Sequence, residues 1–374
     1  MSDSPTTIRT IGNSNKFKLG LFSYNNYGGL TNTLAPERWD ASWENTVTLT
    51  RAAEDAGLEF MLPLAGWLGH AGAESSTDGH FHETMAWAAG LLQATSRIHM
   101  FATLHVPFIN PVFAAKQAVT CDHIGHGRFG INVVAGYNRD EFDMLGVEYL
   151  GHDERYAYLD EWTTLVKRMW TEEEPFDFSG RYFNLKGVWT KPRPAVPGRP
   201  TVVSAGSSPA GRAFALRQAD ALFMIITDLE TLAAELRQLH TSMEDRQIEV
   251  FSSGHVICRE TRREAEEYLH YLLYENGDWA AGHYMQKSYE EIKSVPDEVV
   301  RSKEFLERLM SGHGTYRVLG SPDDVVATFQ RMSDAGLDGM AFALPSYLAD
   351  FEIIRDEVLP RMESAGLREP FVLP

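Results

Sequence analysis

The segment GHGRFGINVVAGYNRDEF (residues 125–142) decides between two α/β folds. Its first six residues match the G-x-G-x-x-G spacing of dinucleotide-binding turns, which follow a strand and open a helix. Here the order is reversed, because GHGRFG follows a predicted helix over 111–124 and precedes a predicted strand over 129–135. We therefore interpret Gly125 as a helix cap and Gly127 as a turn residue, and expect no dinucleotide site on this loop.

Strands and helices alternate on both sides of this segment. Before it, the hydrophobic pattern predicts strands over 18–24, 59–64 and 98–106, with helices over 42–56 and 83–96. After it, the same pattern predicts helices over 154–170, 209–218, 229–241 and 261–275, and strands over 200–205, 221–226, 249–260 and 339–344. Eight such strands predict a closed TIM (β/α)8 barrel, since doubly wound sheets usually stop at about five to seven strands.

Two stretches are too long for a minimal strand and helix repeat. Residues 176–200 read as a hairpin followed by a Pro-rich connection, and residues 277–316 are rich in charge and Gly. Insertions in barrels usually decorate the catalytic rim, so we expect both to lie there. The chain is therefore interpreted as a single domain over 1–374, with a core over about 17–365.

Composition narrows the classes of partner and location. The net charge of −18, from 34 basic and 52 acidic residues, disfavours nucleic acid and anionic membranes. No apolar run reaches the roughly 18 residues of a spanning helix, and the first residues carry no hydrophobic signal region. We expect a cytoplasmic protein in which Cys121 and Cys258 are packing residues.

Polar residues follow the predicted strand over 129–135. Asn132 points into the barrel if Ile131 and Val133 point outward, because neighbours in a strand alternate. A buried amide there is either a satisfied core group or a ligand contact. Glu141 lies in a short predicted helix at the same rim, so this end of the strand is a candidate site.

A second candidate site lies in AGSSPAG (205–211). Ser208 is placed to cap the next helix, and the hydroxyls of Ser207 and Ser208 lie beside the free amides of that helix start. This arrangement favours an anion such as phosphate, although an ordinary helix cap has the same sequence. Arg155 and Tyr156, on the preceding helix, are candidates for the charge and phenol that a phosphate would contact.

Four motifs, in this order and spacing, resemble the bacterial luciferase-like flavin monooxygenases, and most of all the alkanesulfonate, dimethyl sulfone and pyrimidine monooxygenases. They are GRFGINVVAGYNRDEF, HDERY, FSGRYF and AGSSPAG. The resemblance implies a TIM barrel that takes reduced FMN from a separate NAD(P)H-dependent flavin reductase and uses O2 as co-substrate. It further implies a homodimer or homotetramer that oxygenates a small organic substrate with C–S or C–N bond cleavage.

The resemblance also implies roles for individual residues. Thr103 and Asn132 match a polar pair that shapes an O2 pocket, where a hydroxyl and an amide stabilise developing negative charge. The positions that match flavin contacts are Ala65, Gly66, Asn132, Glu141, Arg155, Tyr156 and Ser208, with Ser207 beside them. No metal site is implied.

Departures from the family pattern bear on the substrate. Ser253 stands where alkanesulfonate enzymes have an arginine, which argues against a buried sulfonate. Tyr137 stands where the pyrimidine and sulfone enzymes have a tryptophan, and His82 stands where the alkanesulfonate enzymes have a cysteine. His255 matches a histidine of the alkanesulfonate enzymes. We interpret His82 and His255 as candidate proton shuttles.

The aromatic residues expected to wall the substrate pocket are Tyr24, Trp67, Tyr137 and Tyr347. Neutral organosulfur compounds and N-heterocycles or amides both remain as substrates.

Three other functions stay open at this point. His80 and His82 form an H-x-H that would suit a metal-dependent barrel hydrolase, although no complement of ligands follows at later strand ends. A deazaflavin- or flavin-dependent enzyme of the same superfamily would transfer hydride without O2. A flavin-binding protein without catalysis is the third alternative.

Overall fold

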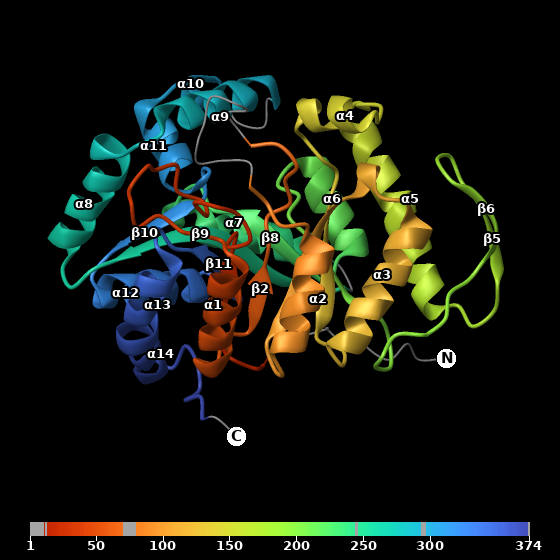
Figure 1. The fold of residues 1–374 in the computed structure, drawn as a ribbon, viewed down its shortest axis with the longest axis horizontal. Helices are drawn as coiled ribbons and strands as arrows, with labels where there is room; N and C mark the ends of the chain where they lie inside the picture. Colours follow the sequence, from red (N-terminus) through yellow and green to blue (C-terminus); the bar gives the residue numbers. More distant parts are fainter. Residues whose placement is uncertain (1–10, 12, 70–79, 244–245, 293–296, 373–374) are drawn as a thin grey trace.

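Eight parallel strands form a closed barrel in the computed structural model, which describes residues 11, 13–69, 80–243, 246–292 and 297–372 (Figure 1). The last strand pairs with the first, so the predicted barrel is confirmed. The strands, in the order in which they pair, are β1 (Lys18–Phe22), β2 (Phe60–Leu62), β3 (His99–His105), β4 (Phe129–Val134), β7 (Thr201–Ser204), β8 (Ala221–Ile225), β9 (Glu249–Cys258) and β11 (Gly339–Ala343).

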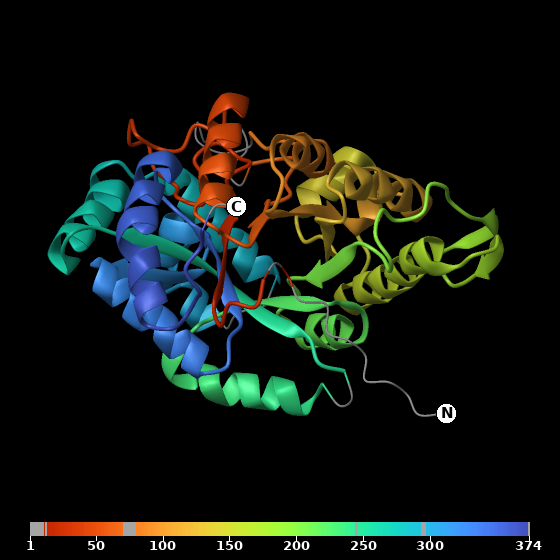
Figure 2. The same ribbon diagram turned by 90° about the horizontal axis from the view of Figure 1, so that it is seen from below.

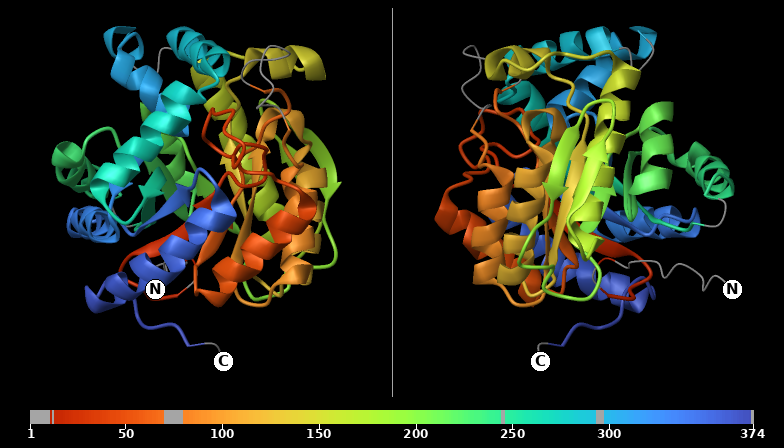
Figure 3. Two further views of the ribbon diagram at one scale, coloured as in Figure 1. Left: turned by 60° about the vertical axis from the view of Figure 1, so that its left-hand side comes forward. Right: turned by 90° about the vertical axis from the view of Figure 1, so that its right-hand side faces the viewer.

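Helices surround the barrel, as the views in Figure 2 and Figure 3 show. They are α1 (Trp43–Asp55), α2 (Thr84–Ala94), α3 (Pro111–Ile124), α4 (Arg139–Leu145), α5 (His152–Thr171), α6 (Pro209–Gln218), α7 (Leu229–Thr241), α8 (Arg262–His270), α9 (Trp279–Ile292), α10 (Asp297–Val300), α11 (Lys303–Gly312), α12 (Pro322–Asp334), α13 (Tyr347–Ile353) and α14 (Leu359–Ser364). In the described ranges, no helix combines the length and the apolar character needed to cross a bilayer.

The glycine motif lies at the end of α3. Gly125 is the C-cap residue of that helix, and Gly127 has a φ of 88°, a conformation that favours glycine. The chain then enters β4, which begins at Phe129. The interpretation of GHGRFG as a helix-to-strand turn is therefore confirmed.

The first insertion contains the expected hairpin, made of β5 (Phe176–Ser179) and β6 (Asn184–Val188). The carboxylate of Glu161, on α5, accepts hydrogen bonds from the three amides of the hairpin turn, those of Arg181, Tyr182 and Phe183, at 2.8 to 2.9 Å. A Cβ at Gly180 would lie 2.2 Å from that carboxylate. The FSGRYF motif therefore serves to dock the hairpin on α5, and its glycine leaves room for the carboxylate. The expected place of this insertion at the catalytic rim was wrong, because the segment connects α5 to the start of β7 and packs on the outside of α5 (Figure 1).

The second insertion forms α9, α10 and α11, which lie at the top of Figure 1 near α4. The Tyr284 hydroxyl, on α9, donates a hydrogen bond to Asp140, on α4, at 2.7 Å. This insertion therefore lies at the rim beyond the carboxyl end of β4, as expected. One further strand was not predicted: β10 (Tyr316–Gly320) pairs only with the second half of β9. Because β10 pairs on one side only, it is only partly buried, and its sequence therefore shows a weak hydrophobic pattern.

Aromatic side chains fill the amino-terminal half of the barrel. The ring of Phe60 contacts those of Phe101, Phe223 and Phe251 with centroids 5.4 to 6.1 Å apart. Gly130 faces Phe101 across the β3 and β4 pair, and a Cβ there would lie 2.5 Å from the ring. This dry layer forms a floor under the next inward-facing residues, Thr103 and Asn132.

Asp220 joins the connection before β7 to the start of β8. Its two oxygens accept hydrogen bonds from both terminal nitrogens of Arg199 at 2.7 Å, and one also accepts from the Val202 amide at 2.8 Å. Burial raises the pKa of this carboxyl, but Arg199 and the amide outweigh burial, so the pKa lies below its usual value. The ionised form therefore stabilises the fold.

We expect Asp220→Asn to lower the free energy of unfolding by about 3 kcal/mol at pH 7, because Arg199 would lose its buried partner. The carboxylate contribution is complete above the unfolded pKa near pH 4 and is lost as pH falls through the lower folded pKa. The difference between the two proteins should therefore shrink below pH 4 in denaturant titrations. Asp55→Asn is the matched control, because the Asp55 pair with Arg97 is exposed and should contribute less than about 1 kcal/mol.

Candidate active site

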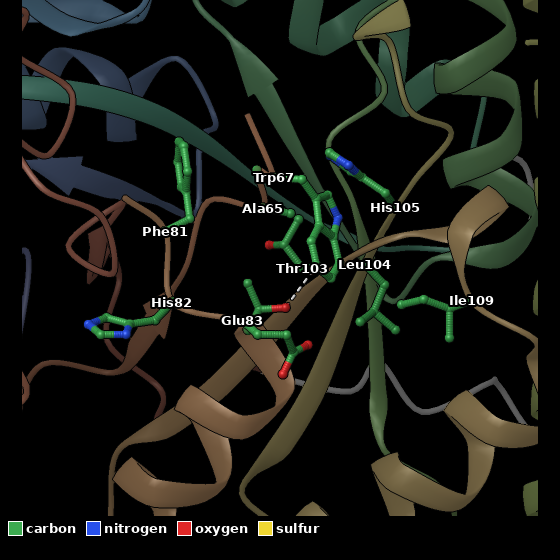
Figure 4. A pocket seen from close by; sticks show the side chains of 11 residues that line it. Ala65, Trp67, Phe81, His82, Glu83, Thr103, Leu104, His105 and Ile109 are labelled. Carbon is green, nitrogen blue, oxygen red and sulfur yellow. Dashed lines mark hydrogen bonds between the residues drawn. The ribbon is translucent and has the colours of Figure 1, made fainter. Parts of the chain in front are cut away.

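A pocket opens at the carboxyl ends of β2 and β3 (Figure 4). Its walls come from the loop after β2, the start of α2, the end of β3 and the turn that follows. The lining residues are Ala65, Gly66, Trp67, Phe81, His82, Glu83, Thr84, Thr103, Leu104, His105 and Ile109. The structure therefore brings together five residues expected at the site from sequence: Ala65, Gly66, Trp67, His82 and Thr103.

The pair of Thr103 and Asn132 forms at the edge of this pocket. The two residues face each other in the parallel register of β3 and β4, and Asn132 Nδ2 donates to Thr103 Oγ1 at 3.1 Å. The Thr103 hydroxyl donates in turn to the Pro63 carbonyl at 2.5 Å. Asn132 Oδ1 is buried and has no hydrogen-bond partner within the described part of the chain. An orphan acceptor is costly, so this amide is suited to a ligand that donates a hydrogen bond.

Glu141, on α4, is buried behind the loop that follows β2. Its Oε1 accepts from the amides of Trp67 at 2.8 Å and Leu68 at 3.3 Å, and its Oε2 lies 3.1 Å from Nδ1 of His105. Burial raises the pKa of Glu141, but His105 and the two amides outweigh it and hold the pKa below its usual value. Glu141 is therefore an ionised tether between α4, β3 and the pocket loop.

The sequence analysis missed six of the lining residues: Phe81, Glu83, Thr84, Leu104, His105 and Ile109. Among them, His105 is the one that contacts Glu141. It lines the pocket, is almost fully buried and is two residues beyond Thr103 in β3. Because side chains two apart share one face of a strand, the inward orientation of Thr103 was a signal that His105 points inward too. Its contact with Glu141 spans 36 residues of sequence and had no local signal.

The AGSSPAG segment starts α6 as expected. Ser208 is the N-cap, and its Oγ accepts from the Gly211 amide at 3.2 Å, whereas Ser207 is exposed. A Cβ at Gly211 would lie 2.7 Å from both the Gly206 Cα and the Tyr156 hydroxyl. The Tyr156 hydroxyl therefore lies at the first turn of α6, in a cradle that only glycine leaves open.

Arg155 is a buried cation near the start of α5. Its Nη1 donates to the Leu150 carbonyl at 2.6 Å, and its guanidinium lies 4.4 Å from the ring centroid of Tyr149. Its Nε has no hydrogen-bond partner, and no carboxylate pairs with it among the residues that the structure describes. A buried guanidinium in this state is suited to an anion such as phosphate.

The two candidate proton shuttles lie in different places. His82 lines the pocket, but its Nε2 lies 2.8 Å from the Ala41 carbonyl and its ring points away from Thr103 (Figure 4). His255 is fully buried with Nε2 3.0 Å from Thr31 Oγ1, and it does not line the pocket. Burial, and then the charge of Arg317, lowers the pKa of His255 to about 3, so the ring is neutral at physiological pH. The catalytic roles of His82 and His255 therefore stay predictions.

The expected aromatic walls divide into two groups. Trp67 lines the pocket, and Tyr137 lies exposed on the loop after β4. Tyr24 and Tyr347 lie in the core instead: both are fully buried, with the Tyr24 hydroxyl 3.0 Å from Thr50 Oγ1 and the Tyr347 hydroxyl bonded to the Phe22 carbonyl. Their sequence positions beside strand ends suited either location, and packing against Trp87 and Trp39 buries them.

Side chains with metal-ligating groups do not gather in the described ranges, where no three His, Cys, Asp or Glu residues could hold one ion. His80 packs near the ring of Tyr27, and His82 is bonded as described above. Cys121 and Cys258 are buried and free, and burial raises the pKa of each thiol to about 12. The two cysteines are therefore packing residues, as expected.

Comparison with known proteins agrees with this geometry. The chain is 26% identical over 338 residues to the FMNH2-dependent dimethylsulfone monooxygenase of Pseudomonas fluorescens (strain Pf0-1), which covers 89% of this chain and 91% of that protein. It is 29% identical over 360 residues to the pyrimidine monooxygenase of Enterobacter sp. (strain 638), with 92% and 96% covered.

Among solved structures, a long-chain alkane monooxygenase shares the fold, with a TM-score of 0.84 and 19% identity over 96% of this chain and 94% of that chain. Residues 18–339 match the family described as luciferase-like monooxygenase. This match spans the barrel from β1 to the start of β11 and includes the pocket. The chain therefore belongs to the luciferase-like monooxygenase family.

Proposed function

We propose that this chain is the oxygenating component of a two-component flavin monooxygenase. It takes reduced FMN from a separate NAD(P)H-dependent flavin reductase, uses O2 as co-substrate, and oxygenates a small neutral substrate with cleavage of a C–S or C–N bond. The observation that carries the proposal is the buried pair of Thr103 and Asn132, which lies beside the pocket and leaves Asn132 Oδ1 without a partner among the described residues.

The residues present fit FMN. Its phosphate would lie at the start of α6, near Ser208 and Tyr156, with Arg155, whose Nε has no partner among the described residues, as the cation. Its ring would lie against the Ala65 and Gly66 backbone that lines the pocket, on the side away from Phe81, whose ring fills the space that a Cβ on Gly66 would take, at 2.9 Å. When bound, reduced FMN supplies the two electrons that activate O2.

The chain itself supplies position, dryness and hydrogen bonds. The Thr103 hydroxyl proton is committed to Pro63, so its oxygen accepts from Asn132 and fixes the amide in one orientation. Asn132 then keeps a second Nδ2 proton, which we expect to stabilise negative charge that develops on the transferred oxygen. The aromatic layer of Phe60 and Phe101 below the pair excludes water from that side.

Charge around the pocket supports a neutral substrate. The described lining residues include no Lys or Arg, and they include Glu83, whose carboxylate accepts from the Met85 and Ala86 amides as the cap of α2 and would repel a nearby anion. The two relatives reported above are named for dimethylsulfone and for pyrimidine. A neutral organosulfur compound and an N-heterocycle or amide are therefore the two substrate classes that we propose.

Thr103→Val and Asn132→Ala should each lower coupled oxygenation by roughly 100-fold, the usual effect of losing one charge-stabilising donor or its support. Consumption of reduced FMN should continue with release of unproductive hydrogen peroxide, so the ratio of product to O2 consumed is the measurement. Thr163→Val is the matched control, because Thr163 is also fully buried but lies on α5, and its hydroxyl makes no hydrogen bond to any residue in the described ranges. Intact coupling in both pocket variants would contradict the role of the pair.

Arg155→Ala should weaken FMN binding by roughly 10- to 100-fold, because a charged hydrogen bond contributes about 1.5–3 kcal/mol. Riboflavin, which has no phosphate, should bind both proteins with nearly the same affinity. Fluorescence titration with the two flavins measures the difference. Arg217→Ala, on the exposed far end of α6, is the control and should change neither affinity. Equal losses for FMN and riboflavin would place the phosphate elsewhere.

A substrate panel with reduced FMN and 18O2 tests the reaction itself. Neutral sulfones, thioethers, pyrimidines and amides are compared with alkanesulfonates, and mass spectrometry shows which bond breaks and where the label goes. We expect one labelled product from a neutral compound and none from a sulfonate. Turnover without O2 would instead indicate the hydride-transferring alternative.

A further inference from the structure

The loop after β2 depends on a carboxylate from elsewhere in the chain. Pocket residues Ala65, Gly66 and Trp67 lie on this loop, and the amides of Trp67 and Leu68 both point to Oε1 of Glu141. Glu141 is on α4, more than 70 residues later in the sequence. The position of the loop therefore follows the position of one carboxylate.

That carboxylate is held on its other side by the histidine. Nδ1 of His105 lies 3.1 Å from Oε2 of Glu141, which is an ion-pair distance although the two atoms are not aligned for a hydrogen bond, and both side chains are almost fully buried. The His105 ring packs against Phe108 with centroids 5.6 Å apart, and Phe108 packs against Phe142, the neighbour of Glu141 on α4, at 4.7 Å. Aromatic contacts thus fix the ring and the helix that the pair connects.

We propose that His105 is a positioning residue for the flavin-facing loop. By holding Oε2 of Glu141, it leaves Oε1 aimed at the amides of Trp67 and Leu68 and so fixes the backbone of Ala65 and Gly66. This inference rests on the proposed function only where it names the flavin as the ligand of that loop. The tether itself exists in the free protein.

The alternative role, plain packing, makes a different prediction. A packing histidine would be replaced by a leucine of similar size at the cost of stability alone. A tethering histidine requires a polar N–H group at the place of Nδ1, facing the Glu141 carboxylate, and the side-chain amide of asparagine also provides one. His105→Leu and His105→Asn therefore separate the two roles.

The first readout is amide hydrogen exchange in the protein without flavin. We expect the peptide that contains Trp67 and Leu68 to exchange about tenfold faster in His105→Leu than in the wild type, and to return to within about threefold in His105→Asn. The second readout is FMN affinity and the visible circular dichroism of the bound flavin. His105→Leu should bind FMN about tenfold more weakly with an altered spectrum, and His105→Asn should restore both.

His99→Leu is the matched control. His99 lies in the same strand at its other end, packs against Phe101, and does not line the pocket. It should leave both the exchange of the loop and the affinity for FMN unchanged. Wild-type exchange and flavin affinity in His105→Leu would overturn the inference, as would equal losses in His99→Leu. Failure of the wild type to bind FMN would overturn the proposed function instead, and the exchange data would still decide the tether.

Discussion

The parallel register between β3 and β4 is the constraint on which the pocket depends. It places Phe101 opposite Gly130, Thr103 opposite Asn132, and His105 near the carboxyl end, where the pocket opens. Because side chains alternate, a shift of β4 by one residue against β3 would turn Val133 inward in place of Asn132 and break the pair. Gly130, opposite Phe101, is required for this register, because a larger residue there would collide with the Phe101 ring. The pairing of β3 with β4 therefore positions both the aromatic layer below the pocket and the polar pair of Thr103 and Asn132.

A second constraint is the cost of a buried carboxylate. Burial of Glu141 disfavours its charged form, and the contacts from His105, Trp67 and Leu68 lower its pKa and so favour that form. These partners come from β3 and from the loop after β2, so the charge connects three parts of the rim. Arg155 shows the complementary case, a buried cation whose Nε has no partner in the described chain. The charge of Glu141 is paired within the protein and connects its parts, whereas Arg155 has a carbonyl and an aromatic ring as partners and no carboxylate among the described residues.

Local pattern predicted the barrel, its eight strands, the hairpin and the inward orientation of Asn132, because each depends on periodicity or turn residues. The pairing of Thr103 with Asn132 followed from resemblance and is confirmed as a contact. His105 was not predicted because its partner, Glu141, lies on another element. The pattern within one strand shows which side of the strand a side chain is on, but not which residue it contacts. The same limit applied to Tyr24 and Tyr347, whose positions beside strand ends did not reveal that Trp87 and Trp39 enclose them.

The GHGRFG turn shows why spacing alone does not assign a ligand. Glycines permit close approach, and here the approaching group belongs to the chain itself: a Cβ on Gly127 would lie 2.6 Å from the Val196 side chain, in the Pro-rich connection. Asp122, at the end of α3, accepts the Ala195 amide at 2.7 Å and fixes that connection against the turn. At the other end of β4 the chain leaves through Gly136, also at positive φ, toward Glu141. The direction of the strand therefore decides that the first glycines serve stability, while Glu141, beyond the other end of the strand, supports the loop that lines the pocket.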